Sequence, residues 1–291
     1  MIRSYAQQAE DVRLARAFSQ QSTGLYIDVG ACHPVFDSVT KYFYDHGWSG
    51  IDIEPGAEGA ELLRSDRPRD IVLELACSDE EGEAVLYEST EPGWSTLHPD
   101  VAAYTADHRR TTHRSRTTAT RTLASICREH VHGPIDFLTV DVEGHEAAVL
   151  RGADFDRWRP AIIVVEATLP HTTTPSHADW EPKLLGAGYE FAVFDGINRF
   201  YVAREHADLR RLIEPPVTAL DDWETHRYLG AREHADNLER ELAETRQGLE
   251  EEHRLRVAAE AALQRRRETS LAAPRGLVKA ARSTSRLLHT E

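Results

Sequence analysis

Short apolar runs alternate with helical segments between residues 24 and 203. The first five runs are almost continuously hydrophobic, which is typical of strands that are covered on both faces. Their alternation with helices predicts βαβ units, and therefore an α/β fold with a mostly parallel sheet. The last two runs are joined by the loop "GINR", whose length and glycine predict a terminal antiparallel hairpin. The expected strands cover residues 25–29, 49–55, 70–78, 135–142, 161–167, 189–194 and 199–203.

Residues 89–120 interrupt this pattern, because they are polar, basic and rich in threonine and show no apolar period. Long irregular loops inside compact domains are uncommon and often functional. We therefore weigh two interpretations equally for this region, a flexible surface loop and a lid over a site.

The character of the chain changes again after Ala203. Pro215 and Pro216 predict a linker over residues 206–220. Residues 221–268 are highly charged and predict a long solvated helix, with a short coiled coil as the more specific alternative. Two charged residues interrupt the middle of its heptad-like seam. The seam positions are Leu238, Leu242, Thr245, Leu249, Glu252, Arg256, Ala259 and Leu263.

The final segment, residues 269–291, is basic with interleaved leucine and valine residues. Such a segment is typical either of a disordered tail or of weak contact with an anionic membrane surface. We expect that deleting residues 221–291 changes assembly or location and leaves the cofactor affinity of the preceding domain intact.

The composition narrows the class of protein. A formal net charge of -15 disfavours nucleic-acid binding, which needs a basic face. Cys32, Cys77 and Cys127 form no C-x-x-C pattern, which argues against a structural zinc site and favours reduced thiols. The N-terminal residues lack the apolar core of a signal peptide, and no run approaches the roughly 20 apolar residues of a membrane span. We expect a cytoplasmic protein.

The stretch "YIDVGACHP" carries the first candidate chemistry. Gly30 ends a strand and opens a helix, which is the usual position of a nucleotide site in an open α/β sheet. The second and third glycines of a dinucleotide motif are missing, which disfavours NAD or FAD. S-adenosylmethionine, which has no phosphate, fits better. An ordinary strand-to-helix turn without any cofactor is the alternative.

Acidic residues follow the ends of successive strands. Asp28 suits the ammonium group of S-adenosylmethionine, directly or through water. Glu54 lies 24 residues after Gly30, at the distance where an acid typically accepts hydrogen bonds from ribose hydroxyls. Ser78 and Asp79 end the third strand, where an adenine amino group could be recognised. Helix capping or simple solvation explains each acid taken alone, whereas their occurrence together favours a cofactor site.

The stretch "TVDVEGHEAAVLRG" carries the candidate catalytic residues. Asp141 lies in an apolar strand, which is costly unless its charge is used or paired. Glu143 follows it, and Glu166 ends the next strand. We expect Asp141 or Glu143 to face Glu166 across a cleft, as a general base or as ligands of Mg²⁺, with Asp141 and Glu166 the candidate metal ligands.

Three further residues are expected near these carboxylates in the fold. His33 and His145 could each abstract a proton near neutral pH, although a surface position is the simpler interpretation of His145 alone. Glu146 is expected in the first turn of the following helix, where the helix dipole favours a negative charge.

In this order, the motifs resemble the FkbM-type family of S-adenosylmethionine-dependent methyltransferases. The matching stretches are "SYAQQAEDVRLARAF", "YIDVGACHPVFDSVTKYFYDHGWSGIDIEP", "LACSDEEGEAVLYE", "IDFLTVDVEGHEAAVLRG" and "IIVVEATLP…FDGINRFYVA", over roughly residues 2 to 205. The resemblance implies a Rossmann-like class I methyltransferase domain over residues 1–205. It also implies methyl transfer to a hydroxyl oxygen of a sugar, a glycolipid or a polyketide-type product.

The resemblance adds site residues that composition does not indicate. Residues 1–20 become an N-terminal segment that covers the cofactor, with Asp11 among its candidate residues. The family usually has Asn at the position of Cys32, and a thiol cannot make both amide hydrogen bonds. The expected cofactor contacts are Tyr5, Gln7, Glu10, Asp28, Gly30, Ala31, Cys32, Ser38, Glu54, Ser78, Asp79 and Asp141.

The sequence thus predicts an O-methyltransferase that acts on a sugar hydroxyl of a glycan, glycolipid or glycosylated product. The extension resembles those of enzymes of cell-surface polysaccharide assembly. It suggests self-association or a partner helix through residues 221–268, and weak membrane contact of the tail at the inner face of the membrane. The alternatives are a non-sugar natural-product acceptor, an NAD-dependent sugar enzyme disfavoured by the missing glycines, and a non-catalytic scaffold of a glycan-assembly complex.

Overall fold

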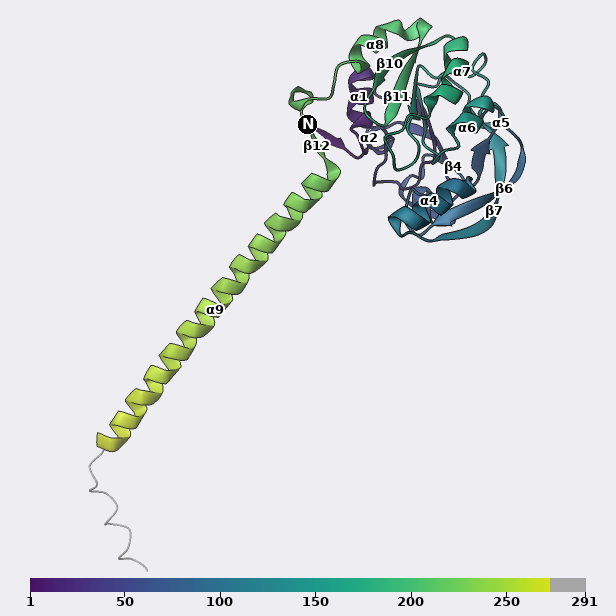
Figure 1. Ribbon diagram of the computed structural model, residues 1–291. Coiled ribbons are helices and arrows are strands. Elements are labelled where there is room, and N and C mark those ends of the chain that lie inside the picture. The colour runs from purple at the N-terminus through teal and green to yellow at the C-terminus, as the bar shows by residue number, and fades with distance from the viewer. Residues whose placement is uncertain (273–291) are drawn as a thin grey trace, which may run out of the picture. The chain divides into compact units, whose positions relative to one another are not determined.

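A seven-stranded sheet forms the centre of residues 1–229 in the computed structural model (Figure 1). The structure describes residues 1–272. The strand order is β10-β11-β9-β8-β2-β3-β4, and only β11 runs antiparallel to its neighbours. The predicted α/β fold with a terminal antiparallel hairpin is therefore confirmed. The strands are β2 (Leu25–Val29), β3 (Ser49–Ile53), β4 (Ile71–Leu73), β8 (Phe137–Val140), β9 (Ile162–Glu166), β10 (Tyr189–Phe194) and β11 (Asn198–Ala203).

Helices cover both faces of this sheet. They are α1 (Glu10–Ala17), α2 (Lys41–Asp45), α3 (Ala57–Asp66), α5 (Leu123–His130), α6 (Glu146–Arg151), α7 (Glu181–Gly186) and α8 (Ala207–Ile213). Short 3-10 turns occupy His177–Asp179, Arg204–His206 and Ala219–Asp221.

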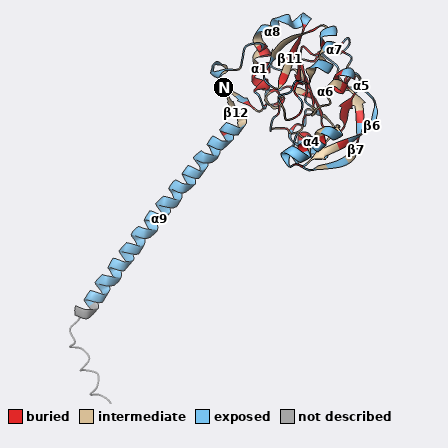
Figure 2. Ribbon diagram, viewed as in Figure 1, coloured by how far each residue is buried: buried red, intermediate tan, exposed pale blue. Residues whose placement is uncertain are grey.

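Alternate residues of each strand enter two separate hydrophobic clusters, because side chains along a strand point to opposite faces. In β2, Tyr26 packs with the residues of α1 and α2, whereas Ile27 and Val29 pack with those of α5 and α6. Both faces of the sheet are therefore shielded from water, and the central strands are almost entirely buried (Figure 2).

A second sheet, of three strands, was not predicted. It consists of β5 (Ala76–Ser78), β7 (His113–Thr122) and β6 (Gly82–Ser89). The expected single strand over residues 70–78 is wrong, because the chain leaves the large sheet after Leu73 and then pairs with β7.

The expectation that residues 89–120 are irregular is also wrong for most of the stretch from residue 99 onwards. Helix α4 (Pro99–Arg109) and strand β7 occupy most of it, and α4, β6 and β7 lie together at one side of the domain (Figure 1). Strand β7 pairs with β6 along eight residues and buries few side chains. Threonine supports an extended strand through its branched Cβ, so this strand needs no apolar period.

The structure differs from the expected linker at residues 206–220. This segment contains α8, whose buried Ile213 joins the cluster that includes α1. The Arg13 guanidinium donates hydrogen bonds to the carbonyl oxygens of Ile213 and Pro215, which fastens the segment to α1. The first compact unit therefore runs to Leu229.

The two ends of this unit are joined by a pair of short strands. β1 (Ile2–Ser4) pairs in parallel with β12 (Trp223–Thr225). The ring of Tyr5 also stacks on His226 with ring centres 4.9 Å apart. The boundary expected at residue 221 therefore lies inside the first unit, and a deletion that starts there would remove β12 as well as the long helix.

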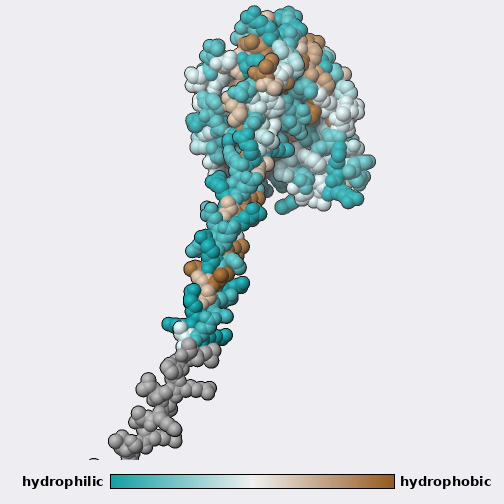
Figure 3. Space-filling model, turned by 90° about the vertical axis from the view of Figure 1, so that its left-hand side faces the viewer, coloured by the Kyte–Doolittle hydropathy of each residue, from teal (hydrophilic) through white to brown (hydrophobic). Residues whose placement is uncertain are grey.

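Helix α9 (His226–Ala272) continues into the second unit, which starts at Gly230. From Gly230 to Thr269 all its described side chains are exposed, including Leu238, Leu242 and Leu249 of the predicted seam. The face of α9 that is visible in Figure 3 is mostly hydrophilic and carries a few separate hydrophobic patches. A long helix is thus present, while its self-association stays a prediction. In the part of the chain that the structure describes, no helix has the length and apolar character to cross a membrane. The basic tail lies outside the described residues from 273 onwards.

Candidate active site

The turn after β2 allows an unusually close approach of two chain segments. Gly30 has φ +91°, and a Cβ atom there would lie 1.7 Å from the carbonyl oxygen of Asp141. Its N–H and that of Ala31 donate hydrogen bonds to the carbonyl oxygen of Ile53. Only glycine fits this position, which brings the ends of β2, β3 and β8 together.

Three neighbouring cavities open at this edge of the sheet. The Glu54 cavity, of about 60 Å³, is lined mainly by apolar residues such as Ile53, Ala76 and Leu86. The Asp28 cavity, of about 380 Å³, shares Gly30, Cys32 and Asp141 with it. The Thr168 cavity, of about 500 Å³, shares Gln7, Trp94, Asp141 and Glu143 with the Asp28 cavity. Asp141 and Glu143 line all three cavities.

Glu54 is held in place by the backbone. Its two carboxylate oxygens accept hydrogen bonds from the N–H groups of Cys32 (2.9 Å) and Gly56 (2.5 Å). Burial raises the pKa of Glu54 to about 7, although these hydrogen bonds oppose the rise. The carboxylate is thus fixed at the Glu54 cavity with lone pairs left for a ligand.

Asp28 belongs to a buried network at the floor of the Asp28 cavity. It accepts hydrogen bonds from the hydroxyls of Thr40 (2.9 Å) and Thr139 (2.6 Å). Arg67, which is fully buried, donates to Thr40 and to Ser38. Burial raises the pKa of Asp28, and its hydroxyl partners lower it.

The N-terminal segment supplies two residues to the cavities. Gln7 lines the Asp28 and Thr168 cavities, and Glu10 lines the Asp28 cavity. Asp11 shapes the segment, because its carboxylate accepts hydrogen bonds from the Ser4 hydroxyl and the Tyr5 N–H, both at 2.7 Å. Burial raises the pKa of Glu10 to about 8.

Four of the expected cofactor residues line none of these cavities. Ser38 accepts a hydrogen bond from Arg67, and the Tyr5 hydroxyl donates to Asp45. Asp79 pairs with Arg151 at 2.9 Å, and the hydroxyl of Ser78 lies 3.1 Å from His145 Nε2. Each is occupied by a protein partner, and a role in cofactor binding stays a prediction for all four. The other expected cofactor residues line at least one cavity: Gln7, Glu10, Asp28, Gly30, Ala31, Cys32, Glu54 and Asp141.

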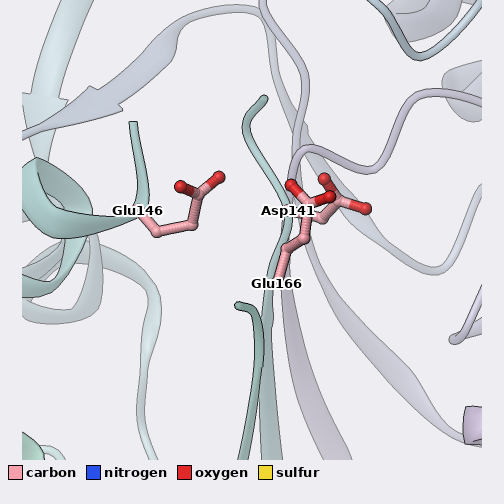
Figure 4. Close-up of side chains that lie close together, drawn as sticks. All are labelled: Asp141, Glu146 and Glu166. Carbon is pink, nitrogen blue, oxygen red and sulfur yellow. The ribbon is translucent and has the colours of Figure 1, made fainter. Parts of the chain in front are cut away.

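Three carboxylates gather beyond the turn (Figure 4). Asp141 follows β8, Glu166 ends β9, and Glu146 begins α6; one oxygen of each lies within 4.8 Å of the others. Asp141 and Glu166 lie next to one another, and Glu146 extends towards them from the side of α6 (Figure 4). The sequence predicted that Asp141 or Glu143 would face Glu166, and the structure brings Asp141 next to Glu166. The sequence also placed Glu146 correctly in the first helical turn. It did not indicate that Glu146 joins the cluster.

Crowding of these acids changes their protonation. Burial and the neighbouring acids raise the pKa of Glu166 to about 11. Burial likewise raises the pKa of Glu146 to about 7, although backbone N–H groups at Val142 and Gly144 donate to its Oε1. Asp141 is exposed to the cavities, yet desolvation by the surrounding protein and the charge of Asp28 raise its pKa to about 6.

Glu143 faces a histidine that sequence reasoning missed. Its Oε2 lies 3.8 Å from His171 Nε2, and neither atom has a hydrogen-bond partner in the described part of the chain. The His171 ring also packs against Trp94, with ring centres 4.1 Å apart. Burial and the neighbouring carboxylates raise the pKa of Glu143 well above its usual range. His171 and Trp94 lie in loops, where no periodicity indicates a role.

The two predicted catalytic histidines each line a cavity and also make contacts within the protein, His33 at the Asp28 cavity and His145 at the Glu54 cavity. His33 Nδ1 accepts hydrogen bonds from the N–H groups of Val35 and Phe36, both at 3.0 Å, so it orders the loop that lines the Asp28 cavity. His145 lies between Ser78 and His98, and burial lowers its pKa to about 4. His145 is therefore neutral near pH 7, and its ring nitrogens are occupied.

The fold and the site together define an enzyme with an α/β sheet and an acidic ligand site at the carboxyl ends of its parallel strands. The family model for the methyltransferase FkbM domain matches residues 28–191. The chain therefore belongs to the FkbM methyltransferase family. The predicted family is confirmed, and with it the Rossmann-like fold and the enzyme class.

Solved structures with a similar arrangement are methyltransferases of low sequence identity. A TehB-like SAM-dependent methyltransferase from Corynebacterium glutamicum is 9% identical, over 67% of this chain and 88% of that chain, with a TM-score of 0.36. An O-methyltransferase from Bacillus cereus in complex with SAH is 11% identical over 69% and 84%, with a TM-score of 0.35. Fibrillarin from Aeropyrum pernix with bound S-adenosyl-L-methionine is 15% identical over 66% and 75%, with a TM-score of 0.33.

These scores are too low to carry an argument, and the fold rests on the strand order described above. A comparison with curated proteins gives no significant match.

Proposed function

We propose that this protein transfers a methyl group from S-adenosylmethionine to a hydroxyl oxygen of a sugar. One observation carries the proposal. Gly30 lines both the cavity that contains the fixed carboxylate of Glu54 and the acidic Asp28 cavity.

The lining of the two cavities suits a cationic nucleoside without phosphate. Glu10, Asp28, Asp37, Asp141 and Glu143 line the Asp28 cavity, and Arg227 is its single Lys or Arg residue in the described chain. Such a lining favours a ligand with positive charges and disfavours a pyrophosphate. Glu54 would accept hydrogen bonds from the ribose, and the apolar lining beside it suits a base.

When bound, S-adenosylmethionine supplies an electrophilic methyl group on a sulfonium. The residues of this chain hold the acceptor and take its proton. Asp141 and Glu143 are the proposed proton acceptors, because they line both the Asp28 and the Thr168 cavities. Much of the rate should come from holding the acceptor oxygen in line and excluding water.

The Thr168 cavity supports a sugar as acceptor. Its lining combines Trp94 with hydroxyl, amide and imidazole groups. An aromatic face packs against the C–H groups of a sugar ring, while convergent polar groups bind its hydroxyls. The polar residues of this lining include Gln7, Thr168, His171, Thr172 and Thr173.

Calorimetric titration with S-adenosylhomocysteine tests the donor site, with NAD⁺ as control ligand. We expect wild-type protein to bind S-adenosylhomocysteine and not NAD⁺. Glu54→Ala should lower that affinity at least about tenfold, since it loses a charged hydrogen-bond acceptor. Glu83→Gln, at an exposed position of β6, is the matched control and should leave it unchanged. Binding of NAD⁺ alone would contradict the proposal.

Methyl transfer is tested with labelled S-adenosylmethionine and glycan fractions as acceptors. Label in an alkali-stable ether on a sugar is the expected product. Binding of S-adenosylhomocysteine with no transfer to any glycan would favour the scaffold function, and transfer to a non-sugar hydroxyl would replace the acceptor class.

A further inference from the structure

The search for a further function leads to the three carboxylates beyond the Gly30 turn. We propose that Asp141, Glu146 and Glu166 form a site for a divalent cation, Mg²⁺ or Mn²⁺, which binds the acceptor hydroxyl. The acceptor part of this inference rests on the proposed function, whereas the cation site does not.

The spacing of the carboxylates suits a small, hard cation. One oxygen from each lies within 4.8 Å of the others. In an octahedral site with Mg–O distances of about 2.1 Å, ligand oxygens lie between about 3 Å and about 4 Å apart. The three oxygens therefore need to move inwards by no more than about 1 Å, which side-chain torsions allow.

An orphan oxygen points to a missing partner. Glu166 is only 7 % exposed, and its solvent-shielded Oε2 has no hydrogen-bond partner in the described chain, although Asp141 lies close enough to share a proton with this carboxyl. A buried acceptor without a partner is costly, so such groups usually bind something. Glu166 also lines the Thr168 cavity, so a cation on this oxygen would lie within reach of an acceptor.

The charge of the cluster is not balanced by the protein. Among the residues that the structure describes, no Lys or Arg pairs with Asp141, Glu146 or Glu166. Like charges held so close cannot all remain ionised without a counter-charge. A divalent cation and bound protons are the two ways to relieve this repulsion, and they make opposite predictions in a metal titration.

One of the three ligands is already fixed by the backbone. Glu146 Oε1 accepts hydrogen bonds from the N–H groups of Val142 (3.1 Å) and Gly144 (3.0 Å). Hydrogen bonds of this kind orient the ligands of metal sites and tune their basicity. The turn that carries Glu143 and Gly144, both at positive φ, is therefore built around this carboxylate.

The site defines a class of acceptor. Three carboxylates occupy three of the six positions of Mg²⁺ and leave the others for water and substrate oxygens. Two hydroxyls on neighbouring carbons can take two of these positions together, which favours a vicinal diol such as that of a sugar ring. Bound to the cation, the reacting hydroxyl loses its proton more readily. Glu143, which lines the same cavity, is then the group that takes the proton.

Calorimetric titration of full-length, EDTA-treated protein with MnCl₂, without any acceptor, tests the site directly. We expect one Mn²⁺ per chain with a dissociation constant below about 1 mM. Glu166→Gln should weaken binding at least about tenfold, whereas Glu83→Gln, at an exposed position of β6, should not. Circular dichroism and thermal unfolding of the same preparations show that each variant is folded, and S-adenosylhomocysteine is titrated separately to test the donor site.

The outcomes separate this inference from the proposed function. Wild-type protein that binds S-adenosylhomocysteine but no Mn²⁺ would overturn the cation site and leave the methyltransferase function standing. Equal Mn²⁺ affinity in wild type and Glu166→Gln would place the cation elsewhere and also overturn the site. Mn²⁺ binding lost in Glu166→Gln, in a protein that does not bind S-adenosylhomocysteine, would support the site and contradict the proposed function.

Discussion

Glu54 and Glu166 follow parallel strands of the same sheet and are almost equally buried, at 8 % and 7 % exposure. The two oxygens of Glu54 each accept a backbone hydrogen bond, whereas Glu166 has an orphan oxygen and two acidic neighbours. Accordingly the pKa of Glu54 rises only to about 7, while that of Glu166 rises to about 11. Burial disfavours the ionised form of both carboxyls to a similar extent, and the hydrogen bonds and charges around each one decide how far its pKa rises. Glu54 is prepared to act as an acceptor, while Glu166 needs a proton or a cation.

The largest change in stability and in cofactor affinity should come from a substitution at Gly30, in the turn that lines both the Glu54 and the Asp28 cavities. Gly30→Ala places a Cβ against the Asp141 carbonyl, and should lower the free energy of unfolding by at least about 3 kcal/mol and abolish S-adenosylhomocysteine binding. Urea denaturation and calorimetry measure both. Gly133→Ala is the control, because a Cβ there meets nothing within 4 Å. Unchanged stability in Gly30→Ala would mean that the close approach is not real.

The protonation of Glu54 should make cofactor affinity depend on pH. Its pKa of about 7 means that the ionised form, which accepts more hydrogen bonds, increases as the pH rises through neutrality. Affinity for S-adenosylhomocysteine should therefore rise about tenfold between about pH 6 and about pH 8. Glu54→Gln should flatten this rise. A rise of equal size in Glu54→Gln would assign it to another group.

A smaller change in stability should come from replacing one carboxylate of the cluster formed by Asp141, Glu146 and Glu166. Because burial and the neighbouring acids raise the pKa of Glu166 to about 11, metal-free protein must protonate this carboxylate to fold near pH 7. Glu166→Gln avoids that cost, so metal-free protein should gain at least about 1 kcal/mol of unfolding free energy. MnCl₂ should stabilise the wild type against thermal unfolding and have little effect on the variant. Destabilisation of metal-free Glu166→Gln would show that the carboxylates are already compensated.

Removal of residues 230–291 should change cofactor affinity and stability the least, because Glu54 and Glu166 both lie in the first unit. The fragment 1–229 should keep the cofactor affinity and unfolding temperature of the full chain. The fragment 1–221 lacks β12, and its affinity should fall, because Gln7 and Glu10 are then held less firmly over the cavities. Equal affinities of the two fragments would show that β12 is not needed to hold this segment.

Strand ends were the most predictable part of the site. Glu54, Asp141 and Glu166 each lie at the end of an apolar run typical of a buried parallel strand, so the sequence alone places them at one edge of the sheet. The membership of Glu146 in the cluster depends on the path of residues 142–145, which turn through two positive φ values. Sequence periodicity carries no information about such a turn.

Three other features could not be predicted from the sequence, each for a different reason. Strand β7 is stabilised by backbone pairing and branched threonines, so it lacks the apolar pattern that marks a buried strand. His171 comes from a loop, and only its position beside Glu143 gives it meaning. The packing of α8 was overlooked because Pro215 and Pro216 dominated the interpretation of that segment.

The pairing of β1 with β12 has a consequence for the order in which the protein is made. The segment that carries Gln7 and Glu10 leaves the ribosome before the rest of the first unit, but its partner at residues 223–225 is synthesised only after almost all of that unit. The sheet can form while the chain still grows, since domains fold as units during synthesis. The cover over the cavities is completed last, so a nascent chain can have its hydrophobic core well before it has a finished binding site.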